Sequence, residues 1–257
     1  MAVLKNKVVF ISGASSGIGH ACARAFAQQG AKLILCARRR GHLDRLSGQL
    51  SDKYKTKSFL ITLDVRNREA VLKTINSLPS QWSAIDILIN NAGLARGLDK
   101  IHEGDIDDWE EMIDTNVKGL LYMTRAIVPG MIQRGRGDII NIGSIAGHEV
   151  YPKGNVYCAT KHAVDAITKG LRLDVVGTPL RVCTVDPGLV ETEFSIVRFH
   201  GDKKRANNVY HGIKPLTAED IADAILYCAT RPGHVQISEM IIFPTAQRSS
   251  TVVGREE

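Results

Sequence analysis

Short apolar runs recur along the chain and alternate with segments in which apolar residues repeat at helical spacing. Buried strands are predicted for the runs at 7–12, 32–37, 58–63, 85–93, 137–144, 180–185 and 235–243. Helices are predicted between them, at 20–29, 43–50, 71–78, 107–133, from Tyr157 onward, and from Thr217 to Cys228. Strands and helices in alternation imply a parallel sheet with right-handed crossovers.

Length and composition favour one α/β domain over residues 1–257, because 44% hydrophobic residues in a chain of 257 can form a large core. The five cysteines are widely spaced and show no Cys-x-x-Cys or Cys/His pattern, so we expect reduced thiols and no metal site.

The net charge of +6 comes from interleaved acids and bases, which suits small anionic ligands without forming a nucleic-acid stripe. No apolar run approaches the roughly 18 residues of a membrane span, and we expect a cytoplasmic protein.

A glycine-rich turn, Gly13-x-x-x-Gly17-x-Gly19, connects the first strand to the first helix. Glycines let the backbone approach an oxygen-rich ligand, and the free N–H groups at a helix start favour its negative charge. The order of strand, glycine turn and helix therefore predicts a binding site for a diphosphate. The alternative interpretation is a tight strand-to-helix turn that binds no ligand.

Three consecutive arginines, Arg38-Arg39-Arg40, follow the second strand, where folds that prefer NAD place a carboxylate for the ribose hydroxyls. An arginine at this point can accept a 2′-phosphate, so the run favours NADP. The alternative is a solvated charge run at a helix start, although cations there oppose the helix dipole unless an anion is bound.

Tyr157 and Lys161 are four residues apart, so a helix places them on the same face. A free phenol holds its proton up to a pKa of about 10, which is too high for a good base near neutral pH. An ammonium roughly 5 Å away favours the phenolate by about 3 kcal/mol, or about two pK units, at an effective dielectric near 20. The pair can therefore move a proton; the alternative is a half-buried tyrosine beside a solvated lysine.

Polar residues and one irregular segment lie where a ligand could reach them. Ser144 ends the fifth strand at the carboxyl edge of the sheet, where open α/β folds bind ligands. Asn116 interrupts the apolar pattern of 107–133, either as a functional amide or as a satisfied interior one. Residues 189–216 show no clear strand or long helix but contain apolar residues such as Phe194, so we predict a substrate-covering lid there.

Taken together, these motifs resemble the short-chain dehydrogenase/reductase family over nearly the whole chain. The resemblance rests on Gly13-x-x-x-Gly17-x-Gly19, Asp64-Val65, Asn90-Asn91-Ala92-Gly93, Asn116, Ser144, Tyr157-x-x-x-Lys161 and Pro187-Gly188. It implies a doubly wound, Rossmann-type sheet of seven parallel strands in the order 3-2-1-4-5-6-7, with helices on both faces.

The resemblance also implies roles for individual residues. Tyr157 would be the acid/base for the alcohol or carbonyl oxygen, Ser144 would hydrogen-bond that oxygen, and Asn116 would hold a water in a proton relay. Lys161 would lower the pKa of the phenol and bind the nicotinamide ribose. Further cofactor contacts would come from Gly13, Ser15, Ser16, Gly17, Ile18, Gly19, Arg38, Arg39, Asp64, Val65, Asn91, Pro187, Val190 and Thr192.

Segments 189–199 and 215–223 look more closely like the NADP-dependent 3-hydroxy acid dehydrogenases, a group that includes serine and allo-threonine dehydrogenases and forms homotetramers. The implied reaction is hydride transfer between NADP and the hydroxyl carbon of a small 3-hydroxy acid. The substrate carboxylate needs a cation, and Arg198, Lys153 and Arg96 lie in loops that should border the pocket. The alternative function is a broader NADPH-dependent carbonyl reductase acting on neutral ketones or quinones.

Overall fold

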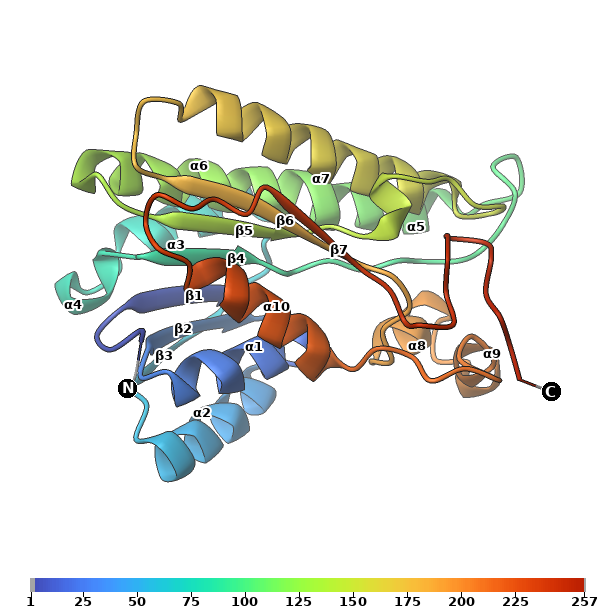
Figure 1. The fold of residues 1–257 in the computed structure, drawn as a ribbon, viewed down its shortest axis with the longest axis horizontal. Helices are drawn as coiled ribbons and strands as arrows, with labels where there is room; N and C mark the ends of the chain where they lie inside the picture. The colour runs from blue at the N-terminus through green and yellow to red at the C-terminus, as the bar shows by residue number, and fades with distance from the viewer. Residues whose placement is uncertain (1–2, 257) are drawn as a thin grey trace.

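The computed structural model describes residues 3–256, and within that range seven strands form one parallel sheet in the order β3-β2-β1-β4-β5-β6-β7 (Figure 1). The strands are β1 (Val8–Ser12), β2 (Lys32–Ala37), β3 (Ser58–Thr62), β4 (Ile87–Asn90), β5 (Asp138–Ile142), β6 (Arg181–Pro187) and β7 (Glu239–Ile242). This topology is the doubly wound one that the motifs implied. The chain adds β2 and β3 on one side of β1 and then returns to add β4 on the other side, so the strand order switches between β1 and β4. Open α/β sheets bind ligands at the carboxyl ends of the strands at such a switch point.

Helices cover both faces of the sheet (Figure 1). One face carries α1 (Gly17–Gln28), α2 (Arg40–Tyr54) and α10 (Ala218–Ala229), and the other carries α3 (Arg68–Asn76), α6 (Leu120–Arg134) and α7 (Asn155–Asp174). The remaining helical segments are α4 (Ser80–Ser83), α5 (Ile106–Ile113), the π-helix η1 (Asp114–Gly119), the 3₁₀ turn η2 (Ile145–Gly147), α8 (Phe194–Arg198) and α9 (Lys203–Asn208).

The central strands are apolar on both sides because both of their faces are covered. In β1, Val9 and Ile11 pack toward α1 and α10, while Val8 and Phe10 pack toward α6. All of β1 is buried, so its side chains form two separate cores, one on each side of the sheet. These cores fix the level at which the strands end, and thereby the position of the loops that follow them.

Several element boundaries differ from the sequence prediction. The segment predicted as one helix over 107–133 is α5, η1 and α6 in succession, with Asn116 inside the π-helical turn. The lid segment contains the short helices α8 and α9, and the predicted strand 235–243 is ordered as β7 only from Glu239 to Ile242. The helix predicted from Thr217 begins at Ala218 as α10, and Thr217 and Asp220 cap it by bonding to each other's backbone N–H groups. No helix within 3–256 is long and apolar enough to cross a membrane.

Candidate active site

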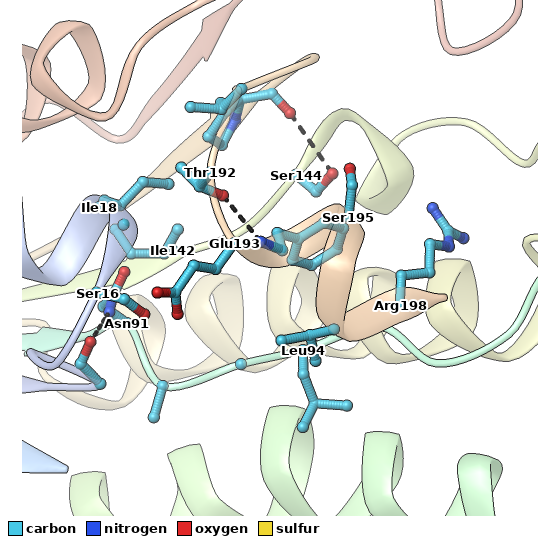
Figure 2. Close-up of a pocket in the computed structure, with 18 of the residues that line it drawn as sticks. Ser16, Ile18, Asn91, Leu94, Ile142, Ser144, Thr192, Glu193, Ser195 and Arg198 are labelled. Atoms are coloured by element: carbon cyan, nitrogen blue, oxygen red, sulfur yellow. Dashed lines mark hydrogen bonds between the residues drawn. The ribbon is translucent and has the colours of Figure 1, made fainter. Parts of the chain in front are cut away.

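A cavity of about 520 Å³ opens at the carboxyl ends of the strands (Figure 2). Its lining comes from the glycine turn, the ends of β2 to β6, the start of α7, the lid and the segment after β7. The cavity therefore lies at the switch point of the sheet, and it brings together the residues predicted for catalysis and for cofactor binding. Asn116 and Gly19 stand immediately behind this lining.

The glycine turn is tightly packed and leaves backbone N–H groups free at the start of α1. Gly13 has a φ of +67°, which favours glycine, and a Cβ at Gly19 would collide with the carbonyl of Gly13. Ser16, the N-cap of α1, makes no side-chain capping bond, so the first N–H groups of α1 are available to an anion. Asn91 holds the turn from β4: its amide donates to the carbonyls of Ser12 at 2.9 Å and Gly13 at 3.2 Å.

Two of the three consecutive arginines line the cavity. Arg39 donates to the hydroxyl of Ser16 at 2.7 Å and pairs with Glu193 of the lid at 3.0 Å. Arg38 lies 3.6 Å from Glu111 of α5 and keeps about half of its side chain exposed. Arg40 instead pairs with Asp44 within α2 at 2.9 Å and is not part of the lining. The structure thus separates Arg38 and Arg39, which face a ligand position, from Arg40.

Asp64 and Val65 follow β3 at the wall of the cavity. Burial opposes ionisation of Asp64, but hydrogen bonds from Arg66 outweigh it and leave the pKa of the Asp64 carboxyl below its usual value. Arg66 approaches Asp64 Oδ2 to 2.6 Å, so this carboxylate is already neutralised by a neighbour. Asp64 is therefore a poor competitor for a cationic partner and does not repel a phosphate strongly.

Three of the four predicted catalytic side chains, those of Ser144, Tyr157 and Lys161, lie together in the cavity wall. Ser144 follows β5, and its hydroxyl accepts the N–H of Ala146 at 3.1 Å and lies 3.5 Å from the carbonyl of Pro187. Tyr157, in the first turn of α7, is only 7% exposed and packs edge-on against Phe194 of the lid at 5.6 Å between ring centres. Lys161 lies one turn later, with its ammonium 5.9 Å from the Tyr157 ring centre.

Burial dominates the proton equilibria of Tyr157 and Lys161. It raises the pKa of the Tyr157 phenol well above its ordinary value, and the neighbouring Ser144 hydroxyl and Arg198 only partly offset this effect. The net direction is therefore opposite to the lowering predicted from Lys161, because burial outweighs the neighbouring groups that favour the phenolate. Burial likewise lowers the pKa of Lys161 to about 8, and its ammonium donates to the carbonyl of Ile142 at 2.8 Å.

The lowered pKa of Lys161 predicts that burying its ammonium destabilises the fold at neutral pH and that this destabilisation disappears as the pH rises. Between pH 8 and its ordinary pKa of 10.5, Lys161 is deprotonated in the folded state but protonated in the unfolded chain, so stability rises with pH. Below pH 8 the penalty is fully present and amounts to about 3 kcal/mol. Relative to Lys161→Met, the native chain should gain about that much as the pH rises through this window. Urea unfolding of both proteins would measure it, and a constant difference would contradict the prediction.

Asn116 lies at the centre of the π-helical turn and is 2% exposed. Its amide forms a pair of bonds with the peptide of Leu94, accepting the N–H at 2.9 Å and donating to the carbonyl at 2.8 Å, and it also donates to Thr160. The extra residue of a π turn is often found at functional sites. Here it orients Asn116 so that the loop after β4 is fixed against α7, directly behind Tyr157.

The three cations considered for a substrate carboxylate are not equivalent. Arg198 lines the cavity, and its guanidinium carbon lies 5.4 Å from the Tyr157 ring centre. Arg96 also lines the cavity but is held by Glu111 at 2.6 Å and by the carbonyl of Val197 at 2.8 Å. Lys153 is exposed and lies outside this lining. Arg198, labelled in Figure 2, is consequently the one of the three cations that lies beside the Tyr157 phenol.

Three further residues complete the site and were missed by the sequence analysis. The Tyr151 hydroxyl accepts a bond from Arg198 at 2.8 Å, and Gln247 Oε1 accepts the N–H of Leu189 at 2.8 Å. Ser250 also lines the cavity. Neither the segment around Tyr151 nor the polar residues after 244 carry a periodic pattern, so nothing in the sequence could have assigned them to the site.

The fold and this constellation define the class of protein. A family model described as short chain dehydrogenase matches residues 7–202, and the chain belongs to that family. This confirms the family that the motifs predicted, and the sheet order confirms the predicted fold. The chain is accordingly an oxidoreductase that acts on hydroxyl groups.

Within the family, the chain is similar to several characterised groups. It is 46% identical to the NADP-dependent 3-hydroxy acid dehydrogenase of Schizosaccharomyces pombe, over 100% of both chains. It is 47% identical to the NADP-dependent 3-hydroxy acid dehydrogenase YdfG of Escherichia coli K12, over 93% of this chain and 96% of the relative. A solved structure, the closed form of serine dehydrogenase complexed with NADP+, is 45% identical with a TM-score of 0.91, over 97% of this chain and 100% of that one.

Proposed function

We propose that this chain is an NADP-dependent oxidoreductase that transfers a hydride between NADP and the hydroxyl carbon of a small 3-hydroxy acid, such as serine or allo-threonine. The observation that carries the proposal is Arg198 in the same cavity as Tyr157, with 5.4 Å between the guanidinium carbon and the ring centre. In a 3-hydroxy acid, one carbon separates the carbinol carbon from the carboxylate. A substrate whose hydroxyl meets Tyr157 can therefore direct its carboxylate to Arg198.

The chain's own groups supply the acid/base part of the reaction. NADP, when bound, supplies or accepts the hydride. Tyr157 gives or takes the proton of the substrate oxygen, and Ser144 hydrogen-bonds that oxygen and fixes its distance from the phenol. The ammonium of Lys161, held by the Ile142 carbonyl, would bind the nicotinamide ribose, and its positive charge offsets part of the cost that burial adds to forming the phenolate.

The cofactor assignment follows from charge and shape. The glycine turn and the start of α1 hold the diphosphate, while Arg38 and Arg39 hold the 2′-phosphate that distinguishes NADP from NAD. Pro187, Val190 and Thr192 border the nicotinamide end of the cavity. The names of the relatives and the NADP+ in the similar serine dehydrogenase support this choice.

Residues 189–216 act as a lid over the substrate. Thr192 and Glu193 lie against the glycine turn and Arg39, and Phe194 packs on Tyr157. Arg198 fastens the far end of α8 through the carbonyl of Gly97 at 3.1 Å. Each contact joins the lid to a different part of the site, so closure would exclude water from the phenol and the substrate together.

The deciding experiment follows NADP+ reduction at 340 nm with L- and D-serine, L-allo-threonine, 3-hydroxyisobutyrate, 3-hydroxypropionate and neutral secondary alcohols, with NAD+ in parallel. We expect turnover of the hydroxy acids with NADP+ and much weaker turnover with NAD+. Activity on neutral alcohols alone would replace the substrate assignment with the broader carbonyl reductase. Inactivity on every substrate, in a protein that binds NADP+, would refute the enzyme assignment.

Arg198→Gln should raise KM for the hydroxy acid by roughly 10- to 100-fold and change turnover of a neutral alcohol little. The lost charge-assisted bond to a carboxylate is worth about 1.5–3 kcal/mol, and a neutral substrate does not make it. Lys204→Gln is a matched control, since Lys204 is an exposed cation on lid helix α9. Equal losses for acid and neutral substrates would assign Arg198 to holding the lid instead.

We also propose that the enzyme is a cytoplasmic homotetramer. Exposed apolar side chains on α5 and α6, namely Ile106, Ile113, Leu121 and Ile132, support burial of these helices against other copies of the chain. Light scattering coupled to size-exclusion chromatography would measure the mass. A monomer at micromolar concentration would contradict the assignment.

A further inference from the structure

A cluster of one imidazole and two carboxylates lies behind Ser144, outside the cavity lining. His148 follows the 3₁₀ turn η2, Asp186 lies near the end of β6, and Glu239 begins β7. His148 Nε2 is 3.5 Å from Asp186 Oδ2 and 3.3 Å from Glu239 Oε1. One ligand atom from each residue lies within 4.8 Å of the other two, so the three groups converge although they are distant in sequence.

The cluster contains a buried carboxylate oxygen without a partner. Asp186 is 1% exposed, and its Oδ2 atom makes no hydrogen bond to any group in residues 3–256. His148 Nε2, which faces it, is also buried and without a hydrogen bond inside the same range. Buried polar atoms are nearly always satisfied, so two such atoms without a hydrogen bond, 3.5 Å apart, indicate a missing ligand between them.

The distances discriminate between two ways of filling this gap. A protonated histidine that paired with a carboxylate would approach to roughly 2.7–2.9 Å, which is closer than either contact observed. Donor atoms around a tetrahedral zinc, with bonds of about 2.0–2.1 Å, stand about 3.4 Å from one another. The two separations from His148 Nε2, 3.5 and 3.3 Å, agree with this second spacing, and the two carboxylates offer oxygens within 4.8 Å of each other.

Charge balance favours the same solution. A neutral imidazole with two carboxylates carries a charge of −2, which a divalent cation neutralises and a single imidazolium does not. One nitrogen and two oxygen donors suit zinc, whereas calcium prefers an all-oxygen set of six to eight ligands. The Glu239 side chain is 29% exposed, which leaves a path for the ion and room for a water as the fourth ligand.

We propose that His148, Asp186 and Glu239 form a binding site for a divalent transition-metal ion of the zinc type. The ion would cross-link η2 to β6 and β7, the last two strands of the sheet (Figure 1). Asp186 also accepts the backbone N–H of Ser144 through Oδ1 at 3.1 Å. The site is thus structural, and it holds the peptide that carries the Ser144 hydroxyl; it does not depend on the proposed substrate.

The test uses the full chain, stripped with a chelator and titrated with Zn2+ by calorimetry and with Co2+ by visible absorption. We expect one equivalent of each metal per chain, the intense visible bands of tetrahedral Co2+, and a rise in Tm on addition of Zn2+. Loss of even an outer partner weakens metal binding by roughly 10- to 100-fold, so His148→Ala and Glu239→Gln should each weaken it by at least about 100-fold. Glu239→Gln is isosteric and keeps the test decisive if His148→Ala unfolds.

His234→Ala and Glu69→Gln are matched controls, because both side chains are exposed and neither belongs to the cluster. These variants should bind Zn2+ as the native chain does. Absence of saturable binding in the native chain would overturn the proposal. So would unchanged binding in Glu239→Gln, or the weak spectrum of hydrated octahedral Co2+.

Discussion

Tyr157→Phe should lower kcat by a factor of about 10³ or more and leave the affinity for NADP+ nearly unchanged. The substitution removes only the phenolic oxygen, which is the proton donor and acceptor, and general acid/base catalysis contributes about 10²–10⁴-fold. The ring remains, so its edge-on packing against Phe194 is preserved. Steady-state kinetics and a fluorescence titration with NADPH measure the two quantities separately.

Tyr151→Phe is the matched control for this experiment. Tyr151 is also a largely buried phenol in the cavity lining, but its hydroxyl accepts a bond from Arg198 at 2.8 Å. Its loss should affect KM for the hydroxy acid more than kcat, because it orients the guanidinium. A Tyr157→Phe enzyme that retains its kcat would remove Tyr157 from the reaction.

Replacing Arg38 and Arg39 together by alanine should weaken NADP+ binding by roughly 30- to 1,000-fold and barely change NAD+ binding. Charge-assisted bonds to a phosphate are worth about 1.5–3 kcal/mol each. The total expected here is about 2–4 kcal/mol, because both side chains are about half exposed and solvent screens them. Competition between the two cofactors in a binding assay gives the ratio directly.

Arg40→Ala provides the control within the same run of charge. Arg40 pairs with Asp44 inside α2. Its removal therefore changes the net charge by as much as the loss of Arg38 or Arg39 alone, but leaves the 2′-phosphate position intact. If Arg40→Ala weakened NADP+ binding as much as the alanine substitution of Arg38 or Arg39 alone, the effect would be long-range electrostatic attraction and not a direct contact with the 2′-phosphate. Equal losses for NADP+ and NAD+ in the double variant would refute the 2′-phosphate assignment.

The strands and most helices could be predicted because they are recorded in local periodicity. β1 and β2 are continuous apolar runs, as strands covered on both faces require, and the cap at Thr217 is a short-range signal. The lid helices α8 and α9 could not be predicted, since helices of five and six residues are unstable in isolation and form only through tertiary contacts.

The chemistry of the site was predictable in position but not in energy. Spacing placed Tyr157 and Lys161 together, whereas the direction of the Tyr157 pKa depends on burial, which spacing does not report. The cluster of His148, Asp186 and Glu239 likewise depends on tertiary structure that sequence spacing does not report. Its ligands come from separate strands and turns, so a search for the local spacing typical of zinc motifs predicted no metal site.

The buried ammonium of Lys161 lowers the stability of the fold while it serves the proposed reaction. At neutral pH the lysine weakens the fold because burial holds its pKa near 8, and its proposed role in the reaction is a reason to keep it. A library of variants selected for heat resistance alone should therefore discard lysine at position 161 early, in favour of apolar side chains of similar length. Variants stabilised in this way would keep the fold and lose the lysine proposed to act in the reaction.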